Sequence, residues 1–265
     1  MLSSFFSCSL AAWIAIALIV LAVPICIILL FLPAWYGRYN RSGKHPLGTL
    51  SARWAWFFQE SPSFVIPCLF LLCRPESFQN TWVNIVCLAF YLFHYFYRSF
   101  IYPFQTKNGK RMPTEIFLMA IVFCILNGTV QAIYQITPCT RRNMSWLYDP
   151  RFIVGAILFV AGLLINWHSD AILRSLRADG STGYKIPQGG MFTFVSGANY
   201  FGECVEWIGY ACLSWNLGAL AFAIFTIANV GPRAIQHHRW YKKTFGDAYP
   251  SSRKALIPFL LSFLC

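Results

Sequence analysis

The sequence contains few charged residues for its length. Only 11% of its 265 residues are charged, whereas about a quarter are charged in an average soluble domain. The nine acidic residues are especially scarce beside 21 Lys and Arg, while hydrophobic residues reach 57% and aromatic residues 18%. This composition argues against a soluble globular protein and is typical of an integral membrane protein. The net charge of +12 requires no nucleic-acid partner, because membrane topology accounts for it.

Several motifs of soluble enzymes and metal sites are also missing. No G-x-G-x-x-G run follows a strand pattern, which excludes a Rossmann dinucleotide fold. The ten cysteines form no metal-type C-x-x-C pair, so we expect no metal site. Seven of them lie in apolar segments and are interpreted as small hydrophobic residues: Cys26, Cys68, Cys73, Cys87, Cys124, Cys204 and Cys212. No polar linker or internal repeat divides the chain, so we expect one membrane domain over residues 1–265.

Apolar segments recur along the chain at bilayer-spanning length. The first, residues 10–33, is nearly uncharged and no A-x-A-like cleavage site follows it, so we expect a retained transmembrane helix. In all, the sequence predicts an all-α protein with seven transmembrane helices, in segments 10–33, 54–73, 81–102, 113–136, 152–168, 191–215 and 217–230. The last segment is short at 14 residues, because the basic tail begins soon after it.

The Lys and Arg residues indicate how these segments are oriented. Of the 21, 17 fall in the loops after the first, third and fifth segments and in the C-terminal tail. Because basic loops remain in the cytosol, the N-terminus is predicted to be non-cytosolic and the C-terminus cytosolic. The connector 169–190 then also lies in the cytosol.

The sixth segment carries three polar residues on one side. Asn199, Glu203 and Glu206 are spaced i, i+4 and i+7, so they form one stripe on a helix. A carboxylate costs several kcal/mol in hydrocarbon, so we expect the stripe to face a water-filled or ligand-filled cavity. The alternative is a soluble amphipathic helix with a solvated acidic face.

Polar residues of other segments fall at the same depth. Gln59 and Glu60 lie six or seven residues beyond Arg53, about 10 Å along a helix, and Tyr95 lies equally far from the cytosolic end of its segment. Further polar residues end the fifth segment and follow the seventh: Asn166, His168, Asp170, Arg233, His237 and His238. We therefore expect a polar site in the cytosolic half and mostly Leu, Ile, Val and Phe in the other half.

An acid beside a phenol in an apolar pocket suits the reduction of a conjugated ketone. A protonated Glu60 or Tyr95 can donate a hydrogen bond to a carbonyl oxygen that gains negative charge in the transition state. A nicotinamide entering from the cytosol would supply the hydride, with its phosphates bound by Arg174, Arg177, Lys185 and Arg233. Each polar residue taken alone is more often a helix-to-helix hydrogen bond, and loop arginines more often determine topology.

Longer motifs resemble the steroid 5α-reductase family. They cover essentially the whole chain after the first segment: Trp56–Glu60, Pro62–Phe64, His94–Phe96, Asn166–Arg177, Ile186–Gly190, Val195–Asn199, Glu206–Tyr210, Arg233–Arg239 and Ser252–Phe259. The resemblance implies a seven-helix membrane enzyme that uses NADPH to reduce the Δ4 double bond of a 3-oxo steroid to the 5α product. It also implies a bilayer environment, in the endoplasmic reticulum of a eukaryote or the inner membrane of a bacterium. The sequence gives no sign of an obligate protein partner.

Carried over by position, the resemblance also implies site residues. Glu60 and Tyr95 would hold the 3-oxo group, and Gln59 and Trp56 would contribute to a steroid pocket among the first four helices. Trp207 would contact the steroid near the junction with the cofactor pocket. The last three helices and the cytosolic loops would hold NADPH through Asn166, Asp170, Arg174, Arg177, Tyr184, Lys185, Asn199, Glu203, Arg233, His237, Tyr241 and Arg98. The chain departs at Lys185, where Arg is expected, and at Met119, where some members have Arg.

Two other classes of protein remain open from the sequence. A membrane methyltransferase of the isoprenylcysteine or phospholipid type also encloses a nucleotide cofactor with C-terminal helices. A sterol-binding membrane protein without enzymatic activity would share the apolar pocket. The nucleotide that copurifies with the protein distinguishes the first class, and NADPH consumption distinguishes the second.

Overall fold

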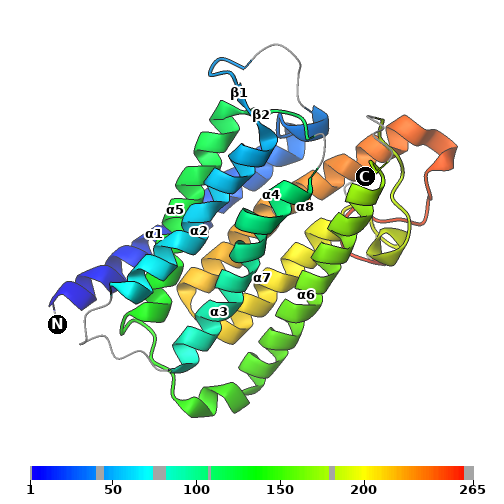
Figure 1. Ribbon diagram of the computed structural model, residues 1–265. Coiled ribbons are helices and arrows are strands. Elements are labelled where there is room, and N and C mark those ends of the chain that lie inside the picture. Colours follow the sequence, from blue (N-terminus) through cyan, green and yellow to red (C-terminus); the bar gives the residue numbers. More distant parts are fainter. Residues whose placement is uncertain (1, 40–44, 74–81, 107–108, 179–182, 260–265) are drawn as a thin grey trace.

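Long helices lie side by side in a single bundle (Figure 1). The structure is a computed structural model, which describes residues 2–39, 45–73, 82–106, 109–178 and 183–259. The helices are α1 Leu2–Phe31, α2 Ala52–Leu72, α3 Trp82–Phe96, the π-helix η2 Tyr97–Ile101, α4 Tyr102–Gln105, α5 Thr114–Ile136, α6 Pro150–Ser175, α7 Ala198–Ser214 and α8 Leu217–Phe245. Strands β1 Thr49–Leu50 and β2 Met112–Pro113 pair antiparallel and join two loops at one end of the bundle. The predicted all-α class is confirmed.

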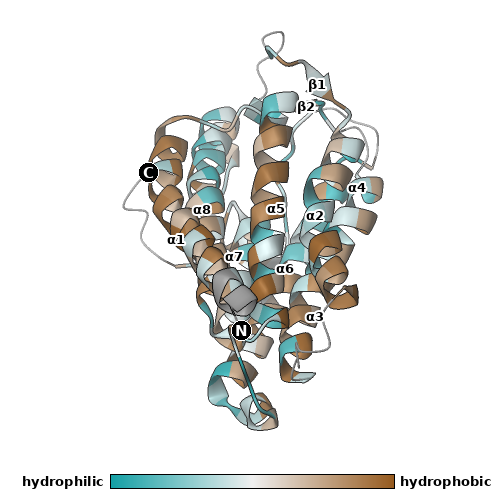
Figure 2. Cartoon of the chain, turned by 90° about the vertical axis from the view of Figure 1, so that its left-hand side faces the viewer, coloured by the Kyte–Doolittle hydropathy of each residue, from teal (hydrophilic) through white to brown (hydrophobic). Residues whose placement is uncertain are grey.

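Among the described residues, six helical segments are long and apolar enough to cross a membrane: α1, α2, the continuous run from α3 through α4, α5, α6 and α8. Their outward side chains are apolar, and Val20, Val122 and Leu164 are each more than half exposed. Hydrophobic residues extend along α1 and α5 in Figure 2. The protein is therefore an integral membrane protein. Helix α7, at 17 residues, is shorter than the ~20 residues of a typical span, so the total of seven stays a prediction.

Three predicted helix boundaries are wrong near the predicted cytosolic side. Helix α6 continues past His168 to Ser175, and α8 continues past Val230 to Phe245. Charge does not end these helices, because Lys and Arg are good helix formers. Helix α7 begins only at Ala198, after Gly189 and Gly190 adopt positive φ angles of 85° and 51°, which a helix cannot accommodate.

Helices α6 and α7 pack backbone to backbone through glycines. A Cβ atom built on Gly162 would lie 2.2 Å from the backbone nitrogen of Glu206, and one on Gly209 would lie 2.4 Å from that of Phe159. Gly155 and Gly202 make equally close approaches along the same contact. Small residues allow such approach between membrane helices, where dispersion and hydrogen bonding replace the hydrophobic effect. The contact fixes the residues of α6 relative to those of α7.

The end of the bundle predicted to be non-cytosolic is more polar than expected. Asn127 donates a hydrogen bond to the Tyr91 hydroxyl (3.1 Å), and Gln131 donates to the Asn127 side-chain oxygen (3.1 Å). The buried Arg142 donates to the side-chain oxygen of Gln135 (3.1 Å). The prediction of a mostly apolar half is wrong here, because isolated amides can pair with one another between helices. Sequence periodicity does not reveal such pairing.

Candidate active site

A cavity of about 1450 Å³ lies between the helices, in the half of the bundle predicted to be cytosolic. Helices α1, α3 and α6 line it near their C-terminal ends, and α2, α5 and α7 near their N-terminal ends. Ligand pockets usually have volumes of roughly 300–1,000 Å³. The cavity therefore has room for two ligands side by side.

One half of the cavity is formed by α2, α3 and α5 and carries the predicted acid and phenol. Gln59, Glu60 and Tyr95 all line it, as does Trp56. Gln59 and Tyr95 are 4% and 6% exposed. The side-chain oxygen of Gln59 has no hydrogen-bond partner among the described residues, so it is available to a ligand. The structure thus brings together the four residues predicted on α2 and α3.

The other half is formed by α6, α7 and α8 and carries pairs of polar residues one helical turn apart. Asn166 and Asp170 come from α6, and Asn199 and Glu203 come from α7. Asn166 donates a hydrogen bond to the backbone carbonyl of Asn199 (3.0 Å), across the glycine contact. These residues face the same cavity as Glu60 and Tyr95.

Helix α8 completes this half with Arg233 and His237. The Arg233 guanidinium donates to the Tyr200 hydroxyl (2.8 Å) and to the side-chain oxygen of Asn229 (3.3 Å). Its charge also lies 4.8 Å from the ring centre of Tyr36, a cation–π contact. Arg233 is therefore held in one orientation from three sides.

Arg98 links the two halves of the cavity. Its guanidinium lies 3.5 Å from the Glu60 carboxylate and 3.5 Å from the Asp170 carboxylate. It also lies over the rings of Trp56 (5.4 Å) and Tyr102 (4.4 Å). Arg98 belongs to the π-helix η2, and such irregular turns are frequent at functional sites.

A second cavity of about 440 Å³ adjoins the first. Arg174, Lys185 and Tyr241 line only this smaller cavity, while Arg177 and Tyr184 line both. Together the two cavities are lined by every residue predicted to bind the cofactor: Asn166, Asp170, Arg174, Arg177, Tyr184, Lys185, Asn199, Glu203, Arg233, His237, Tyr241 and Arg98.

The site fits a phosphorylated nucleotide. The side-chain oxygen of Asn166 and one guanidinium nitrogen each of Arg174 and Arg38 are buried without a hydrogen-bond partner among the described residues. Leaving such groups unpaired costs roughly 1–3 kcal/mol each, so a ligand with complementary groups stabilises them. Arginines match phosphate oxygens, and amide and carboxylate groups match ribose hydroxyls.

Sequence reasoning missed the segment that follows α1. Tyr36, Arg38 and Tyr39 line the larger cavity, whereas the sequence predicts only a basic cytosolic loop after the first segment. Burial raises the pKa of Tyr36 to about 12, although the nearby Arg233 guanidinium opposes the shift, so the phenol stays protonated at neutral pH. Tyr39 stacks on His237 with ring centres 5.6 Å apart. In the sequence, only the proximity of aromatic and basic residues in this segment could have indicated that it lines the cavity.

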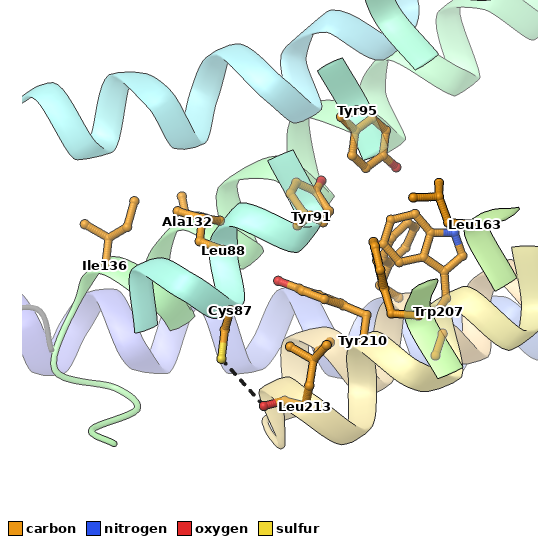
Figure 3. Packing of buried hydrophobic residues seen from close by; sticks show 14 residues of the cluster. Cys87, Leu88, Tyr91, Tyr95, Ala132, Ile136, Leu163, Trp207, Tyr210 and Leu213 are labelled. Carbon is orange, nitrogen blue, oxygen red and sulfur yellow. Dashed lines mark hydrogen bonds between the residues drawn. The ribbon is translucent and has the colours of Figure 1, made fainter. Parts of the chain in front are cut away.

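Four residues predicted to belong to the site line neither cavity: Trp207, Glu206, His168 and His238. His238 is instead fully buried, with Nδ1 2.6 Å from the Ser196 hydroxyl oxygen. Trp207 is 1% exposed and packs in the apolar core with Tyr91, Tyr95 and Tyr210 (Figure 3). Glu206 is fully buried and contacts His94, so the predicted polar stripe reaches the cavity only through Asn199 and Glu203. Glu206 lies seven residues beyond Asn199, about 10 Å deeper along the helix, where side chains fill the bundle. Met119 does line the larger cavity.

Comparisons with known proteins identify the family of this chain. Residues 110–261 match the family model described as 3-oxo-5-alpha-steroid 4-dehydrogenase. The chain is 48% identical over 230 residues to 3-oxo-5-alpha-steroid 4-dehydrogenase 1 of Bos taurus, covering 85% of this chain and 87% of that protein. It is 47% identical over 228 residues to 3-oxo-5-alpha-steroid 4-dehydrogenase 2 of Homo sapiens, covering 86% and 88%. The chain belongs to the 3-oxo-5-alpha-steroid 4-dehydrogenase family.

Proposed function

We propose that this protein reduces the Δ4 double bond of 3-oxo-Δ4-steroids with NADPH, giving 5α-reduced 3-oxo steroids. The observation that carries the proposal is that Glu60 and Tyr95 share one cavity with the polar residues of α6, α7 and α8. The relatives are named 3-oxo-5-alpha-steroid 4-dehydrogenase 1 and 2, and these names support the same substrate class.

The half of the cavity formed by α2, α3 and α5 would hold the steroid. Its apolar lining suits a ring system with little polar surface, and Glu60 and Tyr95 would donate hydrogen bonds to the 3-oxo oxygen. Negative charge grows on this oxygen when the double bond is reduced, and donors in a buried site stabilise that charge strongly. Gln59 and Trp56 would shape the pocket around the ring that carries the oxygen.

The other half, with the smaller cavity, would hold NADPH, which supplies the hydride when bound. Asn166, Asp170, Asn199 and Glu203 would orient the ribose and nicotinamide end near the steroid. Arg174, Arg177 and Lys185 would bind phosphates in the smaller cavity. Arg98 lies close to the carboxylates of Glu60 and Asp170, one in each half of the cavity, and would hold the steroid and NADPH in a fixed position relative to each other.

The proposal is tested with the full chain purified in detergent. We expect a 3-oxo-Δ4-steroid and NADPH to be converted into a product heavier by two hydrogens, with one NADPH oxidised per product. Mass spectrometry of the steroid and absorbance of NADPH measure the two sides of this balance. Copurified S-adenosyl-homocysteine, or steroid binding without NADPH oxidation, would contradict the proposal.

A further inference from the structure

His94 and Glu206 form a buried pair beside the substrate half of the cavity. Nδ1 of His94 lies 2.6 Å from Oε1 of Glu206, and the two residues are 3% and 0% exposed. His94 immediately precedes Tyr95 on α3 and lines the cavity, whereas Glu206 on α7 does not. The imidazole therefore lies between a fully buried carboxyl group and the cavity.

The packing around this pair leaves little freedom to either side chain. The His94 ring meets Trp207 edge to face at 4.5 Å and Tyr95 at 5.1 Å between ring centres. The backbone of Glu206 is pressed against Gly162. The second carboxyl oxygen of Glu206 is buried without a hydrogen-bond partner among the described residues. The Glu206 carboxyl is thus directed at the imidazole alone.

Stability does not account well for such a pair. Placing a carboxyl group inside a membrane bundle is energetically unfavourable, and a buried ionic pair often stabilises a protein no more than well-packed apolar residues would. A carboxyl group that orients an imidazole toward a reaction site is instead a recurring way to prepare a proton donor or acceptor.

The proposed reduction has one chemical task that Glu60 and Tyr95 do not perform. Reduction of a conjugated ketone adds a hydride to C5 and a proton to C4, the carbon next to the carbonyl. Glu60 and Tyr95 are assigned to the oxygen, which leaves the proton at C4 without a donor. His94 lines the same cavity as Tyr95, and the centres of the two rings are 5.1 Å apart.

We propose that His94 donates the proton to C4. Glu206 is the positioning residue, which orients the His94 imidazole and supplies it with a new proton. This inference rests on the proposed function. Once the hydride has reached C5, the enolate electron pair forms the new C–H bond at C4 while the Nε2–H bond of His94 breaks. The imidazole takes the Glu206 proton at Nδ1, which leaves a carboxylate. Water from the polar half of the cavity returns one proton to the pair, so each turnover consumes one hydride and one proton.

The facial selectivity of deuterium at C4 tests this assignment. The full-length enzyme reduces a 3-oxo-Δ4-steroid with NADPH in D2O, the reaction is stopped early, and the product is examined by NMR. A fixed donor adds deuterium to one face of C4 in the wild type. In His94→Gln we expect kcat to fall about 10²-fold, a typical contribution of a general acid, and deuterium to appear on both faces. The enolate then takes its proton from water. Glu206→Gln is expected to change both measurements in the same direction.

Two controls separate this role from a structural one. Tyr210→Phe removes a buried hydroxyl one turn further along α7, outside both cavities, and should keep deuterium on one face. Product incubated in D2O without enzyme measures exchange that does not depend on the protein. An increase in melting temperature on addition of NADP+ in detergent shows which variants are folded. If His94→Gln is not folded, the distribution of deuterium in the product of Glu206→Gln decides whether the assignment holds.

The possible failures are distinguishable. Single-face deuterium and a wild-type kcat in a folded His94→Gln would overturn the role of His94 and leave the proposed function intact. A wild-type protein that reduces no 3-oxo-Δ4-steroid would overturn the proposed function itself, and this inference with it.

Discussion

Cys8 and Cys139 are joined by a disulfide that ties the start of α1 to the segment after α5. Their Cα atoms lie 5.5 Å apart although 131 positions separate them in the sequence. The bond lies at the end of the bundle opposite the cavity, which α1 lines only from Ile25 onward. The seven cysteines interpreted as small hydrophobic residues are free, as predicted. The sequence could not reveal the pair, because nothing in it shows that these two positions meet.

The disulfide supports the predicted orientation. Disulfides persist in oxidising compartments and are rare in the cytosol, so the end that holds Cys8 should be non-cytosolic. In sealed membrane vesicles with the cytosolic face outward, we expect a tag at Met1 to be protected from protease and a tag at Cys265 to be cleaved. Both termini lie outside the described residues. Detergent should expose the Met1 tag. Cleavage of both tags in intact vesicles would mean an even number of crossings.

The roles proposed for Glu60 and Tyr95 predict a selective loss of catalysis. Glu60→Gln and Tyr95→Phe should each lower kcat by about 10²-fold or more, because each removes a donor at the oxygen that gains charge. NADPH affinity should change little, because the cofactor is assigned to the other half of the cavity. The measurements are kcat with saturating steroid and NADPH binding by fluorescence.

Tyr97→Phe is a matched control for Tyr95→Phe. The Tyr97 hydroxyl donates to Gln105 (3.0 Å) and Tyr97 lines neither cavity, so kcat should stay near the wild-type value. An equal loss of NADPH affinity and of kcat in Glu60→Gln would count against the assignment of Glu60 to the steroid.

Hydropathy along the sequence predicts most of the helices, and there are physical reasons why it does not predict all of their ends. Long apolar segments predicted α1 through α6 well, because a bilayer leaves few alternatives to a helix. The sequence predicts the ends of α6 and α8 too early, because charged residues indicate the membrane surface but do not end a helix. In the structure Asp170 and Arg233 lie within continuous helices and face the cavities.

The site was predictable where helical spacing and depth decide it. Asn166 with Asp170, and Asn199 with Glu203, are one turn apart and do face the cavity. Glu206 shares that angular position but lies deeper than the cavity floor, which spacing alone cannot show. Contacts contributed by loops, such as that of Tyr36 with Arg233, depend on a chain path that periodicity does not describe.

The glycine contact between α6 and α7 predicts where the bundle tolerates no side chain. Gly162→Ala places a methyl group 2.2 Å from a backbone nitrogen, so the two helices must move apart. Overpacking of this kind typically costs about 1–3 kcal/mol, and we expect a lower melting temperature in detergent together with weaker NADPH binding. Gly231→Ala in α8 is the control, because among the described residues a Cβ atom there would approach only Leu256, at an ordinary contact distance of 3.9 Å. Equal melting temperatures for the two variants would show that α6 and α7 do not pack this closely.

The two cavities predict different effects for two arginines on cofactor choice. The enzyme should prefer NADPH to NADH, because the 2′-phosphate adds about two negative charges that a guanidinium can bind bidentately. Asp170 could favour NADH by accepting from ribose hydroxyls, but its carboxylate already faces Arg98 at 3.5 Å. Arg177 lines the smaller cavity beside Arg174, whereas Arg233 lines only the larger one.

Arg177→Ala should therefore narrow the ratio of kcat/KM for NADPH over NADH by about 10-fold or more, the usual effect of losing a hydrogen bond to a charged group. Arg233→Ala should lower kcat/KM for NADPH and for NADH by similar factors, because Arg233 would face a part of the cofactor that is the same in both molecules. Arg151→Ala, which breaks a pair with Asp149 at the opposite end of the bundle, should leave the ratio unchanged. A wild-type enzyme that uses NADH as well as NADPH would refute the preference. If the preference holds but responds to Arg233 and not to Arg177, the 2′-phosphate lies in the larger cavity and the cofactor is bound in the opposite direction.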